Sequence, residues 1–451
     1  MDVKRQWLVP RLRSFNSRMA LIADCRHDTY EDIATALEQW LTLLDAQKVM
    51  QATVVVNGDY SCVVIGAILA LYLRGCVVVP LYLADQAKID EVATLTRARY
   101  VIGEVNAFDC RSIEMDGSVP PLIERLFAAN ESGLILLSSG STGVPKAMLL
   151  SLDRLFARYV DQDEFSPMIT AAFLLFDHVG GFNTLIYSLF NGGTLVKLNS
   201  RDPGHVCAHI ERHKIELLPA TPTFLNMLLI GGRDREYDLG SLKLITYGTE
   251  SMPQSTLDNA VKAFPGVRLK QTYGMSELGI LATRSEANDS LWMKIGGDGV
   301  GTRVVDNVLW VKTKTAMLGY LNAASPIDED GWLCTGDVVE VREEYFKVLG
   351  REGDMINVGG LKVVPAEVES HLLCLPFVKD VVVWGKHSPV TGKIVAATVL
   401  TTEPMDVSEA KRQIVLHCRE RLEPFKVPKF IEFAEGQLHS ERFKKVKVRP
   451  Q

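Results

Sequence analysis

The chain has 451 residues, of which 47% are hydrophobic, and its 49 basic and 55 acidic side chains give a net charge of −6. A chain of this length can bury large cores and usually folds into two or more domains. The mildly acidic balance argues against a nucleic-acid-binding protein, which typically has a basic surplus.

The N-terminus lacks the apolar stretch of a secretory signal. The longest apolar segment, 62–80, is interrupted by Arg74 and Gly75. We therefore expect a buried helix followed by a buried strand there, and no membrane span. The eight cysteines occur singly, without a CxxC pair. This spacing argues against structural zinc and fits a reducing, cytoplasmic compartment.

Short apolar runs alternate with longer segments of helical period over the first 250 or so residues. We expect helices at 29–46 and 206–214. The alternation predicts right-handed βαβ units and a largely parallel sheet. The expected strands, several of them buried on both faces, are 52–56, 77–81, 100–102, 134–137, 215–218 and 242–247.

The pattern changes after about residue 295, where short strands follow one another closely at 308–313, 338–342 and 345–349. A tail follows Gly350 and Arg351, and it is long enough for a small α+β domain. We expect strands in this tail at 378–384, 395–400 and 429–433, and a helix at 408–421.

These elements predict an α/β fold in two parts. The large N-terminal domain, 1–350, would combine mixed and parallel sheets with helices and a small β-rich subdomain. The C-terminal domain, 351–451, would be small, mobile and α+β. Gly353, Gly359 and Gly360 cluster at the junction, where a hinge needs a permissive backbone.

The segment SSGSTGVPK, from Ser138 to Lys146, follows one of the expected strands. Backbone N–H groups exposed by glycine, together with hydroxyl donors, can surround a polyphosphate. Lys146 can add a point charge. The segment is not a Walker A loop, because the GxxxxGK[ST] spacing is absent. On turn chemistry alone, a Ser/Gly surface loop is the alternative.

This loop resembles the phosphate loop of the adenylate-forming superfamily, which includes acyl-CoA synthetases, peptide-synthetase adenylation domains and luciferases. Further motifs of that superfamily follow in the same order over nearly the whole chain. One departure is Ala147, where the superfamily usually has glycine. The resemblance implies that the nucleotide's phosphates bind at Ser138, Ser139, Gly140, Ser141, Thr142, Gly143 and Lys146.

Two further segments resemble motifs around the nucleotide base. In TYGMSE, from 272 to 277, the resemblance implies that Tyr273 lies against the adenine and Ser276 binds phosphate. It also implies that Glu277 holds Mg²⁺, which prefers hard oxygen ligands. YGTE, from 247 to 250, resembles the loop that edges the adenine and acyl pockets. An ordinary turn is the alternative for Thr249 and Glu250. The glycines that would border both nucleotide and acid are Gly248 and Gly274.

GWLCTGD, from 331 to 337, resembles the motif whose aspartate accepts hydrogen bonds from both ribose hydroxyls, a role that falls to Asp337. We interpret the nearby segment 317–322 as structural. Residues 349–369 resemble the hinge motif, which implies that Arg351 reaches the ribose or a phosphate. Gly353 stands where many members carry Asp or Lys as the pivot. Residues 359–360 match the loop that lines the thiol tunnel in CoA-using members, and a glycine-rich linker is the alternative.

FDHVGGF, from 176 to 182, resembles a segment of acyl- and aryl-CoA ligases whose histidine gates the carboxylate site, here His178. Asp177 is one residue more than the common pattern, and in amino-acid adenylators an aspartate after phenylalanine holds the substrate amine. Both registers stay open, and the spacing to Gly192-Gly193 favours the CoA-ligase one.

The last motif, at 438–447, is altered. The resemblance places the catalytic lysine at Lys444. Lys445 is an alternative, because the motif's glycine is missing and the register can shift by one. A solvated basic tail is the other interpretation.

The resemblance implies an AMP-forming acid–thiol ligase. It would use ATP and Mg²⁺ to convert a small-molecule carboxylic acid into acyl-AMP. The acyl group would then pass to CoA, or to the phosphopantetheine thiol of an acyl or peptidyl carrier protein, while the C-terminal domain rotates about residues near 351–354. One alternative is an adenylation enzyme that loads only a carrier protein with an amino or acyl group. The other is a degenerate nucleotide-binding protein, supported by the altered tail and Ala147.

Overall fold

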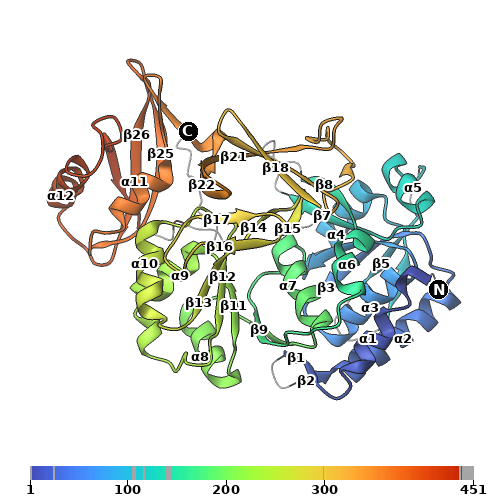
Figure 1. The fold of residues 1–451 in the computed structure, drawn as a ribbon. Helices are drawn as coiled ribbons and strands as arrows, with labels where there is room; N and C mark the ends of the chain where they lie inside the picture. Colours follow the sequence, from blue (N-terminus) through green and yellow to red (C-terminus); the bar gives the residue numbers. More distant parts are fainter. Residues whose placement is uncertain are drawn as a thin grey trace.

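The computed structural model describes residues 3–23, 26–103, 108–114, 117–138, 145–297, 299–435 and 438. They form a mixed α/β protein with a large N-terminal domain and a small C-terminal domain (Figure 1). Predicted site residues 139–143, Lys444 and Lys445 lie outside the described residues. Within these ranges, no helix combines the length and apolarity needed to cross a bilayer.

The first large sheet has the order β20-β8-β7-β4-β3-β5-β6 in the described chain. Its parallel centre is made of β3 (Thr53–Gly58), β4 (Val77–Tyr82), β5 (Tyr100–Ile102) and β7 (Gly133–Ser138), close to the predicted strands. Residues 77–80 of β4 are all buried, as expected for a strand covered on both faces. The antiparallel members are β6 (Cys110–Ser112), β8 (Lys146–Ser151) and β20 (Gly319–Tyr320).

The second large sheet has the order β13-β12-β11-β9-β10-β1-β2. The alternation of strands and helices predicted a largely parallel sheet. In the structure, the predicted strands of the first 250 or so residues are divided between two sheets. Alternation does not reveal where the chain leaves one sheet for the next. The strands, parallel except for β2, are β1 (Met19–Ala23), β2 (Arg26–Thr29), β9 (Ile169–Ala172), β10 (Thr194–Lys197), β11 (Leu217–Ala220), β12 (Leu244–Tyr247) and β13 (Arg268–Gln271).

Helices cover both sheets, and two of them match the prediction closely. The predicted helix at 29–46 is α2 (Tyr30–Ala46), which begins at a capping box formed by Thr29 and Asp32. The predicted helix at 206–214 is α8 (Pro203–His213). The others of the N-terminal domain are α1 (Leu8–Ser14), α3 (Cys62–Leu73), α4 (Gln86–Thr96), α5 (Pro121–Ala128), α6 (Leu152–Val160), α7 (Val179–Phe190), α9 (Pro222–Ile230) and α10 (Gln254–Ala263).

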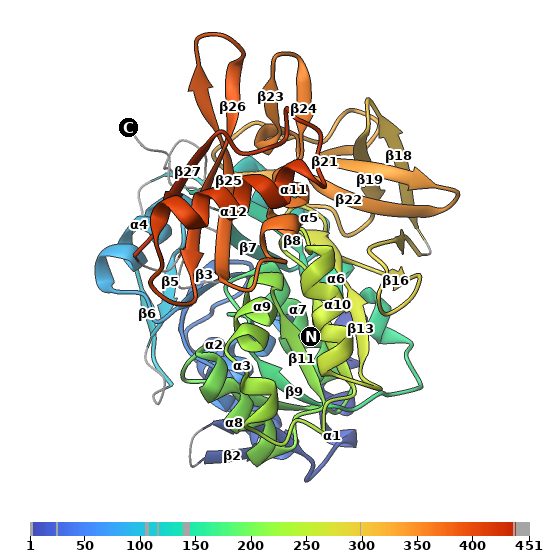
Figure 2. The same ribbon diagram turned by 90° about the vertical axis from the view of Figure 1, so that its left-hand side faces the viewer.

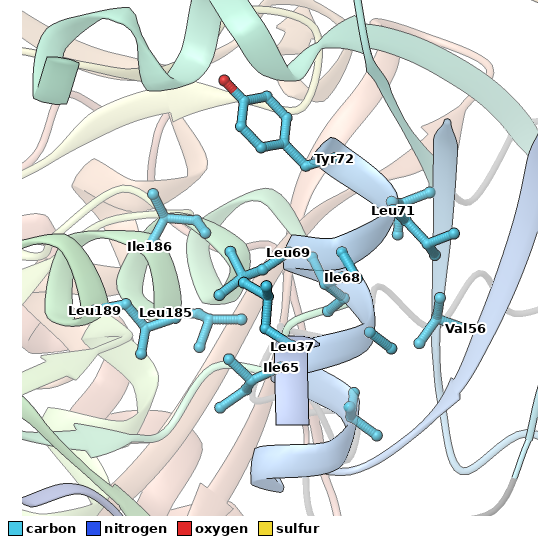
Figure 3. Close-up of a cluster of buried hydrophobic side chains, with 14 of the residues drawn as sticks. Leu37, Val56, Ile65, Ile68, Leu69, Leu71, Tyr72, Leu185, Ile186 and Leu189 are labelled. Atoms are coloured by element: carbon cyan, nitrogen blue, oxygen red, sulfur yellow. The ribbon is translucent and has the colours of Figure 1, made fainter. Parts of the chain in front are cut away.

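The main core is centred on α3, every residue of which is buried. A helix that is apolar all round belongs in a protein interior or a membrane, and here it is the buried helix expected within 62–80. Figure 3 shows α3 between Val56 of β3 on one side and Leu185, Ile186 and Leu189 of α7 on the other. This packing holds α7 in place, and α7 begins directly after His178.

The predicted β-rich subdomain is a six-stranded antiparallel sheet of the order β16-β17-β22-β21-β19-β18 in the described residues. Its register places Asp337 opposite Arg351. The strands are β16 (Thr283–Ser285), β17 (Met293–Ile295), β18 (Val300–Val305), β19 (Val308–Thr313), β21 (Leu333–Arg342) and β22 (Tyr345–Arg351). A separate hairpin joins β14 (Tyr273–Met275) to β15 (Gly279–Leu281).

The C-terminal domain has its own sheet and its own apolar core. Its elements are β23 (Ile356–Val358), β24 (Leu361–Val363), α11 (Pro365–Leu372), β25 (Val378–Ser388), β26 (Gly392–Thr401), α12 (Val407–Arg419) and β27 (Phe430–Phe433). It packs with α11 and β25 against α9, α10 and β22 (Figures 1 and 2). Asn226 donates to the Lys379 carbonyl over 3.4 Å, and Ser255 to the Ser370 carbonyl over 3.2 Å. The predicted boundary at 350/351 stays a prediction.

Candidate active site

A cavity of about 270 Å³ lies between the N-terminal domain, β22 and the C-terminal domain. Loops at the carboxyl ends of β12 and β13 form part of its wall, where α/β sheets usually bind ligands. The C-terminal domain contributes α11 and the start of β25. The predicted site residues that line this cavity are Thr249, Glu250, Tyr273, Gly274, Asp337 and Arg351.

The buried residue Asp337 is the centre of a hydrogen-bonded group on one wall. Its side chain accepts a hydrogen bond of 2.7 Å from the Tyr273 hydroxyl and pairs over 2.8 Å with Arg351 Nε. Arg351 also donates to the Thr335 carbonyl over 3.0 Å, and the Asp337 N–H donates to Thr335 Oγ1. These contacts hold the Asp337 carboxylate in place in the cleft, in contact with both Tyr273 and Arg351.

Burial raises the pKa of Asp337, and the charge of Arg351 and the Tyr273 hydrogen bond only partly offset that rise. Burial likewise raises the pKa of Tyr273, so its hydroxyl keeps the proton that it donates. The ionised carboxylate is therefore costly in the fold at neutral pH. A buried carboxylate with a perturbed pKa in a cleft is a candidate binding group.

The loop after β12 has an unusual backbone at Thr249, whose φ is 71°. Left-handed backbone is rare for a β-branched residue, and such strain tends to occur at functional sites. An ordinary turn was the alternative for Thr249 and Glu250. Here Glu250 is anchored, since its Oε2 accepts a hydrogen bond of 2.6 Å from Thr223 Oγ1.

Two glycines near the cavity allow chain segments to approach each other closely. A Cβ on Gly274 would lie 2.5 Å from the Gly279 carbonyl oxygen. A Cβ on Gly248 would overlap the Thr272 side chain and lie 2.9 Å from the Thr272 carbonyl oxygen. Gly248 itself does not line the cavity, so its role is to let two chain segments approach.

We expect Gly248→Ala to lower the free energy of unfolding by about 1–3 kcal/mol, because the added methyl must displace Thr272 from its bond to the Tyr247 carbonyl. Urea denaturation measures this. Gly353→Ala is the matched control: a Cβ there meets nothing within 4 Å, so the change should stay below about 0.5 kcal/mol. Equal losses in both variants would contradict the steric explanation.

A second group of predicted residues lies around the ends of the phosphate loop. Ser138 and Lys146 are register partners across β7 and β8, so they bracket the loop. The Tyr320 hydroxyl donates to Glu277 Oε1 over 2.7 Å, and Lys146 Nζ lies 5.2 Å from the centre of the Tyr320 ring. Tyr320 therefore connects the residue predicted to hold Mg²⁺ with the lysine predicted to bind phosphate.

The segment 317–322 has a clear structural role. Asn322 accepts a hydrogen bond of 3.0 Å from the Ala147 N–H and donates one of 2.8 Å to the Pro145 carbonyl. These bonds secure the chain where it leaves the phosphate loop. Ala147, the departure from the superfamily's glycine, directs its methyl into an apolar core, where it is fully buried.

Asp177 and His178 precede α7 and do not line the 270 Å³ cavity. His178 Nε2 lies 3.8 Å from Asp177 Oδ1. The preceding backbone is held by Tyr60, which donates to the Leu174 carbonyl over 2.8 Å, and by Arg201, which donates to the Phe173 carbonyl over 2.7 Å. Ser276 and Glu277 lie in the turn between β14 and β15, also outside the cavity lining.

Sequence reasoning missed Tyr320, Thr223 and Thr335 as partners of site residues. Thr335 stands inside the GWLCTGD motif, so its position was a usable signal, whereas nothing in the sequence connects Tyr320 to Glu277. It also missed that Glu369 and Asp380 of the C-terminal domain line the cavity, while Gly359 and Gly360 do not.

Comparison with known proteins identifies the family of the chain. The model of the AMP-binding enzyme family matches residues 10–321, and that of the AMP-binding enzyme C-terminal domain matches residues 367–445. A 4-coumarate–CoA ligase of Oryza sativa subsp. japonica is 28% identical, over 63% of this chain and 57% of that protein. A 2-succinylbenzoate–CoA ligase of Bacillus cytotoxicus is 25% identical, over 96% of this chain and 95% of that protein.

The chain spans about three fifths of the first curated relatives that it matches, from 57% to 62% of their length. Among solved structures, an anthranilate CoA ligase in complex with anthranoyl-AMP superposes with a TM-score of 0.80 at 22% identity, and the match covers 97% of this chain and 95% of that one. At this identity the likeness establishes the shared fold.

Proposed function

The chain belongs to the AMP-binding enzyme family, and on this premise we propose that it activates a carboxylic acid with ATP and transfers the acyl group to a thiol. The observation that carries the proposal is the convergence of Asp337, Tyr273 and Arg351 in one cleft. The relatives' names, which include 4-coumarate–CoA and 2-succinylbenzoate–CoA ligases, favour CoA as the thiol.

The cleft residues suit a bound nucleoside. An ionised carboxylate offers about four acceptor positions. Asp337 uses one oxygen for Tyr273 and the other for Arg351, so it keeps capacity for two ribose hydroxyls. Arg351 would then be free to turn part of its guanidinium toward a phosphate, and the Tyr273 ring would lie beside the base.

Glu277 fits the proposed Mg²⁺. One carboxylate oxygen accepts from Tyr320, and among the described residues no hydrogen bond reaches the other. A hard, partly exposed oxygen beside the phosphate loop matches the preference of this cation. When bound there, Mg²⁺ would neutralise charge on the phosphates. Tyr320 would orient Glu277, and Lys146 would add a second positive charge.

In the first half-reaction, an oxygen of the acid's carboxylate attacks the α-phosphorus, and the bond to pyrophosphate breaks. In the second, a thiolate attacks the acyl carbon and AMP leaves. The protein's contribution is positioning and charge neutralisation. Ser138, Lys146 and Lys444, or Lys445 in the shifted register, would serve the phosphates, while His178 and Asp177 would border the acid.

We expect Tyr320→Phe to reduce acid-dependent ATP–pyrophosphate exchange about 3- to 10-fold, and to raise the Mg²⁺ concentration needed for half-maximal rate, because Glu277 loses one hydrogen bond. Exchange measured against Mg²⁺ concentration tests this. Tyr345→Phe removes a hydroxyl from β22 instead and should leave the curve unchanged. Identical curves for wild type and Tyr320→Phe would refute the orienting role.

The proposal itself is tested by ATP–pyrophosphate exchange across a broad panel of aryl, alkyl and amino acids. At least one acid should stimulate exchange strongly. Mass spectrometry after addition of CoA, or of a phosphopantetheinylated carrier protein, then identifies the acceptor. Absence of exchange with every acid would support the degenerate alternative, and transfer to the carrier protein alone would support the carrier-loading alternative.

A further inference from the structure

A second cavity, of about 80 Å³, lies between α6, α7 and the β14–β15 hairpin. Its wall is mostly apolar, with Phe182, Ile186 and Ile280 among the lining residues. The polar lining residues are Arg154, Arg158, Asn183 and Thr315. An apolar wall with a few polar groups is the usual make-up of a small-molecule site. Since one water occupies about 30 Å³ in the liquid, the space suits a few non-hydrogen atoms.

This cavity lies directly behind the nucleotide cleft. Gly274 lines the cleft, Ile280 lines the second cavity, and the two are register partners in the hairpin. A Cβ on Gly274 would lie 2.9 Å from Ile280 Cα, so a single residue pair separates the two spaces. Helix α7 begins at Val179, next to His178, and residues of its first two turns line the second cavity.

The positive charge at this cavity is only partly balanced. Arg154 pairs with Glu131 over 3.2 Å. Arg158 contacts neutral groups instead: it donates to Asn183 Oδ1 over 2.7 Å and to the Tyr159 hydroxyl over 2.8 Å. In the part of the chain that the structure describes, no carboxylate forms an ion pair with Arg158.

A second cation increases this excess. Lys270 of β13 is half-buried, and no carboxylate of the described residues pairs with it. Burial lowers its pKa, and the charges of Arg268 and Arg158 lower it further. Lys270 therefore adds to the positive charge in the region of Arg158, although it does not line the cavity itself.

We propose that the second cavity receives the far end of the acid substrate and that this end carries a second carboxylate, bound by Arg158 with help from Asn183. The inference rests on the proposed function and narrows its substrate to a dicarboxylic acid with an apolar spacer. The spacer lies against Phe182, Ile186 and Ile280. The planar guanidinium can engage the carboxylate through two parallel hydrogen bonds, for which it would exchange its neutral partners.

The test compares matched acids in ATP–pyrophosphate exchange: adipate against hexanoate, suberate against octanoate, and terephthalate against benzoate. The wild type should prefer the diacid of at least one pair about 3- to 5-fold in kcat/KM, because Arg158 is exposed and an exposed ion pair contributes up to about 1 kcal/mol. Arg158→Gln should abolish that preference while changing the monoacid rate less than about 2-fold. Arg158→Glu should shift the preference to an ω-amino acid such as 6-aminohexanoate.

Arg212→Gln is the matched control, because this exposed arginine of α8 lines neither cavity. Titration calorimetry of each diacid of the panel without ATP gives a readout independent of catalysis, and Arg158→Gln should weaken the binding of the tightest-binding diacid by the same factor. If both acids of every pair react at equal rates, or if Arg158→Gln lowers both rates equally, the inference is wrong and the proposed function is unaffected. Absence of exchange with any acid would contradict the proposed function, and the calorimetry would still decide whether Arg158 binds the diacid.

Discussion

Asp337→Ala is expected to reduce acid-dependent ATP–pyrophosphate exchange by about 100- to 1,000-fold. The side chain is the proposed acceptor for two ribose hydroxyls, and each charge-assisted hydrogen bond contributes about 1.5–3 kcal/mol. The substitution also leaves Tyr273 and Arg351 without their shared partner at 2.7 and 2.8 Å. The loss should appear mainly in the KM for ATP, because the ribose contact is made in both ground and transition states.

A stability measurement separates binding from folding at this position. Burial raises the pKa of Asp337, so its contribution to stability is fully present below the unfolded pKa and is lost as pH rises through the folded pKa. Asp337→Asn removes the buried charge and keeps the shape. It should therefore unfold at higher urea concentration than the wild type at about pH 7, with the difference shrinking as the pH falls, while exchange activity remains low.

The matched control is Asp328→Asn, in the same β-rich subdomain, where the carboxylate pairs with Arg303 at 3.0 Å and is partly exposed. That variant should keep both activity and stability. If Asp337→Asn destabilises the protein at neutral pH and retains exchange, the carboxylate is a structural anchor and the ribose role is wrong.

The strands were predictable wherever apolar runs are bounded by turns. Tyr100–Ile102 and Val308–Thr313 have the predicted limits, because each lies between polar or glycine-rich segments. Helix α2 was predictable from its period and begins one residue later than expected, since Thr29 is its cap. The division into two sheets was not predictable, because it depends on which strands pair across long connections, and strands at the centre of either sheet have the same apolar composition.

The candidate site was predictable as a set of motifs but not as a geometry. The motifs identified Tyr273, Asp337 and Arg351, which the fold brings within hydrogen-bonding distance. The Tyr320–Glu277 bond arises from the pairing of β20 with β8, a contact between residues far apart in sequence. The left-handed backbone at Thr249 could not be predicted from the sequence either, because threonine rarely adopts this conformation.

The face that the C-terminal domain presents to the cleft bears on its proposed rotation. Pro365 and Glu369 of α11 line the cavity, whereas the glycine loop at 359–360 lies away from it, with Gly359 nearest to Thr391. A domain that must present a lysine in one half-reaction and the glycine loop in the other needs to turn between them. A Cβ added to Gly353 would meet nothing within 4 Å, so the space beside this residue does not oppose a turn at this position.

The proposed use of different faces of the C-terminal domain in the two half-reactions is tested most directly at Lys444. We expect Lys444→Ala to lower ATP–pyrophosphate exchange about 1,000-fold, the loss typical of a group that stabilises developing charge only in the transition state. The same variant should form thioester from supplied acyl-AMP and CoA at nearly the wild-type rate, because a rotated domain no longer uses this lysine.

Lys445→Ala is the control that fixes the register, since the two lysines are adjacent and carry the same charge. It should retain both half-reactions within a few-fold. If Lys445→Ala loses exchange but still forms thioester, and Lys444→Ala does not, the catalytic lysine is one residue later than the motif spacing indicates. If both variants keep full exchange, the basic tail is a solvated segment. Charge neutralisation in the first half-reaction must then come from other cations, such as Arg351 in the cleft and Lys146 beside the phosphate loop.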